Sequence, residues 1–542
     1  MDGEVKKKWL LGALVLIVLI GAFLRTYHFH DWLTMRDDQA RDATLVSQVV
    51  KGELPWPEMG PFMSYSGAGD HSEENSFHLG PMYYYFQIIS AKLFGNFPDK
   101  LAYPDAFFGI LAIPLLYFFL RECFRRNISL GVTGLFAFSA YFIQYSRFAW
   151  NTNLIPFFVL LFLFASQKFL MECREDRWKW ALVLGAAIGI GIQLHVILLA
   201  IFFLCALGIA VVSLKKDLGM WKQWMLIVIV AGMLNVTQIT SEIATHFDNT
   251  RHLFGSASHR GSTGLDKVTS LLWNDIDCHI EANAYFLTSY GGDNCGHDFL
   301  GTSAYIGKHA RYDTFADVFS VFERILFVLF AFGGYALLVK RSRHETDERK
   351  RYFLYLVSFY SVITFLVMFP LSVTKIDDFR YFLPMFFIPF VLLGLIMDAF
   401  FARYPRASWY IFGIFFALLL FTNGSALLQD QIQPLLMKDQ TCASHFTTLG
   451  ELEPVATYIA SQEKVGERIS FRGDQDLHVI YYPLAYLLQK YGIGSKELGR
   501  SLDLPEDGSH AYLISCKLNW REAYPYQAVD GFFVIRMDKQ GE

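Results

Sequence analysis

Residues 6–42 read KKKWLLGALVLIVLIGAFLRTYHFHDWLTMRDDQARD: three lysines, an apolar stretch and then a crowded charged segment. A helix needs roughly 20 apolar residues to cross a bilayer, and the stretch 9–24 with its flanks approaches that length. It has no small-residue cleavage site, so we interpret it as a retained membrane anchor whose lysine-rich start lies in the cytoplasm. The charged segment then emerges beside the opposite membrane surface.

The rest of the composition is that of a polytopic membrane protein. Apolar residues make up 53% of the 542 residues and aromatic residues 17%, more than soluble globular chains show. The net charge of −4 argues against a nucleic-acid partner, and neither a Walker-type phosphate loop nor a Rossmann glycine motif is present. We therefore exclude nucleotide chemistry.

Apolar segments of spanning length predict eleven transmembrane helices. They are expected at 9–24, 103–121, 128–146, 152–170, 179–196, 197–213, 223–240, 318–340, 352–370, 381–401 and 408–424.

Positive charge in the short connections predicts the orientation of these spans. The short basic loops all fall on the same side of the membrane as the N-terminus. This places the loops 25–101 and 241–316 and the C-terminal tail outside the cytoplasm. Segment 79–95 is apolar enough for a short span, but counting it would invert every later loop. We therefore interpret it as a re-entrant or interfacial helix, with its tyrosines at headgroup level.

Beyond residue 428 the apolar segments end and the pattern changes. A helix is expected at 454–461 and strands at 469–472, 511–516 and 532–537. We predict a membrane domain over 1–428 and a small extracytoplasmic α/β domain over 429–542.

The cysteines fall on both sides of this topology. Cys278, Cys295, Cys442 and Cys516 lie on the predicted outer side, where disulfides persist. We expect Cys278 to pair with Cys295 and Cys442 with Cys516; the alternative is that all seven cysteines of the chain are free.

An outward site has no access to cytoplasmic nucleotide sugars, so a group transferred there must arrive on a lipid. A lipid-phosphate donor needs an acidic base, cationic groups for its phosphate and an apolar groove for its chain. Asp37, Asp38 and Asp42 supply carboxylates at the predicted outer surface. The cationic candidates there are His78, Arg147 and Arg380.

Four short segments share this predicted outer placement. They are DDQAR at 37–41, HLGPMYYY at 78–85, YSRFAWNTN at 145–153 and RYFLP at 380–384. In this order they resemble the motifs of GT-C glycosyltransferases of the dolichyl-phosphate-mannose protein mannosyltransferase and lipid A aminoarabinose transferase type. Two positions depart from the family pattern: no lysine precedes Gly80-Pro81, and Asp42 replaces the usual aromatic residue.

The resemblance implies a GT-C fold and an integral membrane glycosyltransferase, a hexosyl- or pentosyltransferase using a polyprenyl-phosphate sugar. Asp37 matches the catalytic carboxylate, a general base for the acceptor, and Asp38 would support it. One direct displacement implies inversion at the anomeric carbon. By the same resemblance the donor phosphate would contact Arg147, Arg380 and His78, and the substrates would contact Asp42, Tyr83, Asn151 and Tyr381.

Other classes and ligands stay open. A transporter or flippase of a lipid-linked sugar is the main alternative, although it predicts midplane charges and broken repeats. A receptor-like protein is a third class. We expect no cofactor; a divalent metal is the less favoured alternative, because no loop has calcium-ligand spacing. The expected partners are the donor, membrane lipids and a lipid, glycan or protein acceptor, and the expected location is the plasma or inner membrane.

Overall fold

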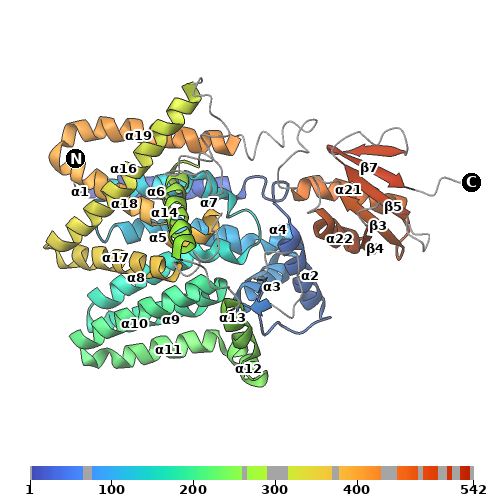
Figure 1. The fold of residues 1–542 in the computed structure, drawn as a ribbon, viewed down its shortest axis with the longest axis horizontal. Helices are drawn as coiled ribbons and strands as arrows, with labels where there is room; N and C mark the ends of the chain where they lie inside the picture. The colour runs from blue at the N-terminus through green and yellow to red at the C-terminus, as the bar shows by residue number, and fades with distance from the viewer. Residues whose placement is uncertain are drawn as a thin grey trace, which may run out of the picture.

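The structure is a computed structural model that describes residues 3–64, 76–258, 265–289, 315–368, 378–428, 448–473, 480–498, 510–515 and 525–537. A helical bundle forms one end of the molecule and a small sheet the other, with short helices of the first loop between them (Figure 1). The N-terminus lies at the far end of the bundle from the sheet.

Long helices coincide with the predicted spans. The bundle contains α1 (Gly3–Thr26), α5 (Tyr103–Leu120), α6 (Arg126–Phe138), α8 (Ile155–Met171), α9 (Arg174–Leu194), α10 (Val196–Lys216), α11 (Trp221–Leu234), α16 (Phe315–His344), α17 (Glu348–Met368), α18 (Ile388–Arg403) and α19 (Pro405–Leu427).

Length and apolarity mark seven helices among the described residues as able to cross a membrane, or up to nine if each of two bent pairs is one span. The bent pairs are α11 with α12 (Val236–Ala244) and the 3-10 helix η5 (Phe379–Met385) with α18. The chain is therefore a mostly helical integral membrane protein. The total of eleven spans remains a prediction. It would require α6 and α9 to cross the membrane in addition to the nine spans above.

Shorter elements connect the spans. They are α7 (Ala140–Gln144), the 3-10 helices η2 (Asn151–Leu154) and η3 (Leu218–Met220), α13 (Asp248–Ser258) and α14 (Leu265–Thr288).

The first outer loop folds into α2 (Asp37–Lys51), α3 (Met82–Phe94) and α4 (Pro98–Leu101), with β1 (Phe62–Ser64) antiparallel to β2 (Ser76–His78). Helix α3 accounts for segment 79–95. Its 13 residues rise only about 20 Å, less than the bilayer core. The expectation for its tyrosines is wrong at two positions, because Tyr83 and Tyr84 are buried against the protein.

The C-terminal segment forms a mixed sheet. It contains α21 (Leu449–Gln462), β3 (Arg468–Gly473), α22 (Tyr481–Lys490), β4 (Gly494–Glu497), β5 (His510–Ser515), β6 (Tyr526–Val529) and β7 (Phe532–Met537). The strand order is β4-β3-β5-β7-β6, with β3 parallel to β4 and β5, and β7 antiparallel to β5 and β6. The helix and strands expected from the sequence overlap α21, β3, β5 and β7. The predicted boundary at 428/429 adjoins residues outside the described ranges and stays a prediction.

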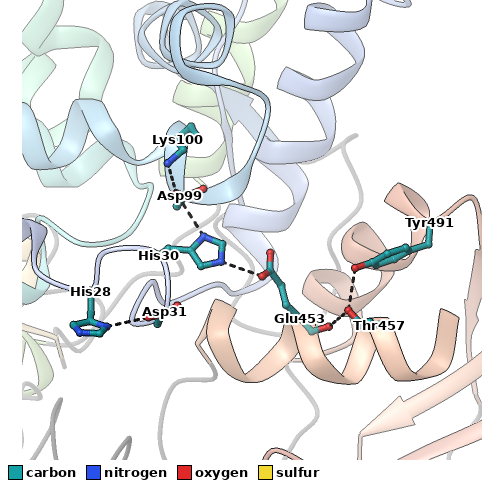
Figure 2. Close-up of polar contacts among 8 residues, drawn as sticks. All are labelled: His28, His30, Asp31, Asp99, Lys100, Glu453, Thr457 and Tyr491. Carbon is teal, nitrogen blue, oxygen red and sulfur yellow. Dashed lines mark hydrogen bonds and ion pairs between the residues drawn. The ribbon is translucent and has the colours of Figure 1, made fainter. Parts of the chain in front are cut away.

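This sheet unit is attached to the first loop. Leu449 N–H donates to Leu33 O over 2.8 Å, and apolar residues of α2 and α22 share one buried core. Figure 2 shows a polar contact at the same boundary: His30 Nε2 lies 3.0 Å from Glu453 Oε2, and its Nδ1 lies 3.5 Å from Asp99 Oδ2. The C-terminal unit is thus fixed next to the loop that carries the acidic run.

Candidate active site

The acidic run opens helix α2. Asp37 and Asp38 occupy its first turn and are exposed. The chain enters the helix through Arg36, whose backbone N–H donates to Gln39 Oε1 over 3.0 Å. Unpaired N–H groups gather at a helix N-terminus and favour negative charge there. The fold therefore holds two exposed carboxylates at a defined position beside the bundle.

Asp42 lies one turn further along and faces the interior. Its Oδ1 accepts hydrogen bonds from Tyr84 Oη at 2.9 Å and from Arg41 Nη2 at 2.8 Å, while Arg41 Nη1 lies 3.0 Å from Asp38 Oδ1. Burial raises the pKa of Asp42, although the adjacent Arg41 guanidinium opposes that effect. Because its side chain is only 1% exposed, Asp42 joins α2 to α3 rather than facing a substrate.

The second motif lies next to this cluster. The Arg41 guanidinium lies 4.6 Å from the centre of the Phe62 ring, which is 6.2 Å from the His78 ring. Asn249 on α13 clamps the backbone of His78: its Oδ1 accepts from His78 N–H at 2.6 Å, and its Nδ2 donates to His78 O at 3.1 Å. His78 is thereby held beside the acidic run.

A buried carboxylate joins the second motif to the third. Asp105, near the start of α5, accepts from Tyr83 Oη at 3.1 Å on one oxygen and from Trp150 N–H at 3.1 Å on the other. Tyr83 and Asp105 are both fully buried. Tyr83 therefore serves as an internal link in this structure, and its predicted substrate contact is not available there.

Arg380 of the fourth motif completes the arrangement. Its guanidinium lies 5.3 Å from the Trp150 ring centre and 5.2 Å from that of Tyr381, and its Nε pairs with Asp378 Oδ2 at 3.2 Å. The side chain is 39% exposed. Arg380 is thus a cation oriented by stacking, with part of its surface accessible, and Tyr381 lies directly beside it.

Arg147 is oriented differently from the prediction. Its guanidinium donates to the carbonyl oxygens of Leu24 (3.1 Å), Tyr27 (2.7 Å) and His28 (3.2 Å), where α1 ends. Burial lowers its pKa to about 10. The predicted phosphate contact disagrees with this geometry, because the donors of the fork are directed at backbone carbonyls at the end of α1.

Asn151 is also internal. Its Nδ2 donates to Leu194 O over 2.5 Å at the C-terminal end of α9, and only 6% of the residue is exposed. It ties the third motif to the bundle. Of the residues expected to contact substrate, Tyr381 is thus the one in this structure that keeps partial exposure.

The chain is similar in fold to solved proteins, and part of it matches a family model. A family model described as dolichyl-phosphate-mannose-protein mannosyltransferase matches residues 78–239. ArnT from Cupriavidus metallidurans in the apo state superposes with a TM-score of 0.54 at 13% identity, over 98% of both chains. The same protein bound to undecaprenyl phosphate gives 0.54 at 14% identity, over 97% of this chain and 98% of that one.

The chain has the GT-C fold. The predicted resemblance is thereby confirmed, and the family match contains the second and third of the four motifs.

A shorter likeness is found to a protein of Bacillus subtilis (strain 168) that is named mannosyltransferase YycA. It is 27% identical over 218 residues, which are 40% of this chain and 30% of that relative. The match therefore covers less than a third of the relative's length.

Within this GT-C fold, the described residues contain no group of three histidine, cysteine or carboxylate side chains that could hold a metal ion. Cys278 is disulfide-bonded, and its partner lies outside the described residues, as do Cys295, Cys442 and Cys516. The predicted pairing therefore stays a prediction. Cys123, Cys173 and Cys205 are free.

Three functional candidates of this chain were not predicted from the sequence. Asp105 lies in the first turn of the predicted span 103–121 and was counted as part of that span. An ionisable residue inside a span is by itself a reason to expect a function. Nothing in the sequence indicates the contact of Asn249 with His78, because single asparagines are common in long loops. Trp150 stood inside a quoted motif, but its stacking on Arg380 depends on a contact across more than 200 residues.

Proposed function

We propose that this protein is a glycosyltransferase that moves a sugar from a polyprenyl-phosphate donor to an acceptor on the outer side of the membrane, with inversion. The convergence of four separated motifs carries this proposal. Tyr84 bonds Asp42 of the acidic run, and the adjacent Tyr83 continues through Asp105 and Trp150 to Arg380. A transport function does not call for carboxylates and a stacked guanidinium at one end of the bundle.

Asp37 acts as the general base, because it is an exposed carboxylate at a fixed helix start. Asp38, paired with Arg41, orients the acceptor or the base. The base removes a proton from an acceptor hydroxyl or amine as that atom attacks the anomeric carbon from the side opposite the phosphate.

Arg380 binds the leaving phosphate. As the bond to the sugar breaks, negative charge grows on the phosphate oxygens, which a planar guanidinium matches in pairs. His78 assists from the first loop. Its Nδ1 lies 3.1 Å from Gly60 O, so Nε2 accepts from a sugar hydroxyl when the ring is neutral and donates to the phosphate when the ring is protonated. We leave Arg147 out of this set because of its contacts with α1.

Orientation and partners follow from the same proposal. The basic connections lie at the other end of the helices, which supports an outward site by the positive-inside rule. The structural relative ArnT was solved with undecaprenyl phosphate, which supports a polyprenyl-phosphate donor. The acceptor is a lipid, a glycan or a protein.

A comparison of cells with and without the protein tests the proposal. Mass spectrometry of lipid-linked sugars should show accumulation of one polyprenyl-phosphate sugar when the protein is absent, together with loss of one glycan modification. The accumulated species then serves as the donor for the purified protein in liposomes.

The catalytic assignment is tested with Asp37→Asn. We expect transfer to fall by about 100-fold or more, in the range of a lost general base, at unchanged expression and thermal stability. Glu53→Gln is a matched control, since Glu53 is an exposed carboxylate of the same loop and should leave transfer intact. Full activity of Asp37→Asn would refute Asp37 as the base, and sugar transport without transfer would favour the transporter alternative.

A further inference from the structure

An apolar groove of about 380 Å³ lies between α6, α18 and α19. It is found at the end of the bundle away from the four motifs. Helix α5 starts beside Asp105 and ends near the groove-lining Arg125, and its 18 residues rise about 27 Å. The groove is therefore separate from the proposed active site, about the thickness of a membrane core away.

Four aromatic side chains line the groove together with a methionine. Phe401 and Met397 come from the end of α18, and Trp409, Phe412 and Phe416 from the first half of α19. Both α19 and the bent segment containing α18 are candidate membrane spans. The groove thus opens on a surface that faces lipid, and its lining suits a hydrocarbon chain.

Two glycines on neighbouring helices keep the groove open. A Cβ on Gly131 of α6 would lie 3.1 Å from the Phe416 ring, and a Cβ on Gly413 of α19 would meet nothing within 4 Å. The space above Gly413 belongs to the groove that this residue lines. A larger side chain there would occupy the groove without displacing its wall.

The mouth of the groove is basic. Arg125 lines it, is 67% exposed and lies 3.6 Å from Asp398, a carboxylate that Arg341 already holds at 2.8 Å. Arg126 and Arg406 are exposed neighbours of lining residues, and the described part of the chain contains no ion pair for either. Asp398 is thus shared between Arg125 and Arg341, and Arg341 also lies 3.6 Å from Glu345. Arg126 and Arg406 add two further guanidinium groups to these pairs.

We propose that this groove is a binding site for an anionic phospholipid of the membrane leaflet at the basic end of the bundle. One acyl chain lies along the aromatic wall, and the phosphate is held by Arg125 with Arg126 and Arg406. Basic pockets between transmembrane helices recognise anionic headgroups in this way, and guanidinium groups match phosphate oxygens better than a point charge does. The proposal does not depend on the transferase activity.

The full-length protein is reconstituted in vesicles that contain either brominated phosphatidylglycerol or brominated phosphatidylcholine. Bromine quenches tryptophan fluorescence on contact, and the difference between wild type and Trp409→Phe isolates the signal of Trp409, which is exposed in the groove. Brominated phosphatidylglycerol should quench it at a lower mole fraction than brominated phosphatidylcholine. Neutralising one arginine should reduce this preference about fivefold.

Three variants test the site. Arg125→Gln with Arg406→Gln should reduce the preference about 25-fold, and Gly413→Leu should reduce the phosphatidylglycerol retained after detergent purification, measured by native mass spectrometry. Gly424→Leu is the control, because Gly424 lies on the same helix with nothing within 4 Å of its Cβ position and outside the groove. Equal quenching by both lipids, or an undiminished preference in the arginine variant, would show that bulk lipid alone fills the groove and would overturn the proposal.

Discussion

The Tyr83 hydroxyl donates a hydrogen bond to Asp105 Oδ2 over 3.1 Å, and both residues are fully buried where α3 meets α5. The other oxygen of Asp105 accepts from the backbone of Trp150, whose ring stacks with Arg380. One carboxylate thus couples the first loop to the proposed phosphate-binding arginine.

Tyr83→Phe leaves one oxygen of this buried carboxylate without its donor. We expect the free energy of unfolding to fall by about 1–3 kcal/mol, visible as a lower melting temperature in detergent. Asp105→Leu should lose more stability and most of the transfer activity, whereas Asp105→Asn should retain much of both, since an amide can bond both neighbours. Tyr482→Phe, at an exposed tyrosine, serves as control; a stable and active Asp105→Leu protein would contradict the coupling.

Arg147→Lys and Arg380→Lys should separate a structural arginine from a phosphate-binding one. Lysine cannot reproduce three bonds to the carbonyls at the end of α1, so Arg147→Lys should lower stability by about 1.5–3 kcal/mol. Its donor concentration for half-maximal transfer should be unchanged. Arg380→Lys should raise that concentration with little change in melting temperature. The opposite pattern would restore the phosphate-binding role to Arg147.

The raised pKa of Asp42 predicts a pH-dependent stability. Burial raises this pKa above its ordinary value of 3.8, so the folded state binds the proton more tightly than the unfolded state. Stability from this group is therefore present at low pH and is lost as pH rises from about 4 through the folded pKa. Asp42→Asn has no carboxyl group to titrate at this position and lacks this loss. As pH rises, the melting temperature of the wild type should therefore fall relative to that of the variant. A wild type that gains on the variant with rising pH would mean that Arg41 outweighs burial.

His30 and Glu453 should couple the first loop to the C-terminal unit. Their atoms are 3.0 Å apart, but the side chains are 43% and 33% exposed, so solvent screens the pair. A double-mutant cycle with His30→Gln and Glu453→Gln should give a coupling of about 0.2–1 kcal/mol. Limited proteolysis between the two units should accelerate slightly in either single variant. A coupling of zero would leave the attachment to the shared apolar core and the backbone hydrogen bond from Leu449 to Leu33.

The bundle and the C-terminal elements could be predicted because both depend on local composition. Apolar length predicts a membrane helix wherever it occurs, and the run of aromatic and β-branched residues at 532–537 predicts a strand from six residues. The interfacial tyrosines were misplaced for the opposite reason. Tyrosine rings are amphipathic and suit the headgroup level of a membrane. Tyr83 and Tyr84 instead donate hydrogen bonds to buried carboxylates on α5 and α2. The sequence pattern alone does not reveal such distant partners.

The sequence alone thus determined the class of the protein, its long helices and the four motifs that resemble the GT-C glycosyltransferases, since these are encoded in contiguous residues. The tertiary structure decided which motif residues face outward and which hold the fold. Arg147 and Arg380 are the same residue type at the predicted outer surface, yet one is directed at the end of α1 and the other stacks on Trp150 with part of its surface exposed. That distinction arises from packing between segments more than 100 residues apart, because the partners available to a guanidinium are fixed when the helices assemble.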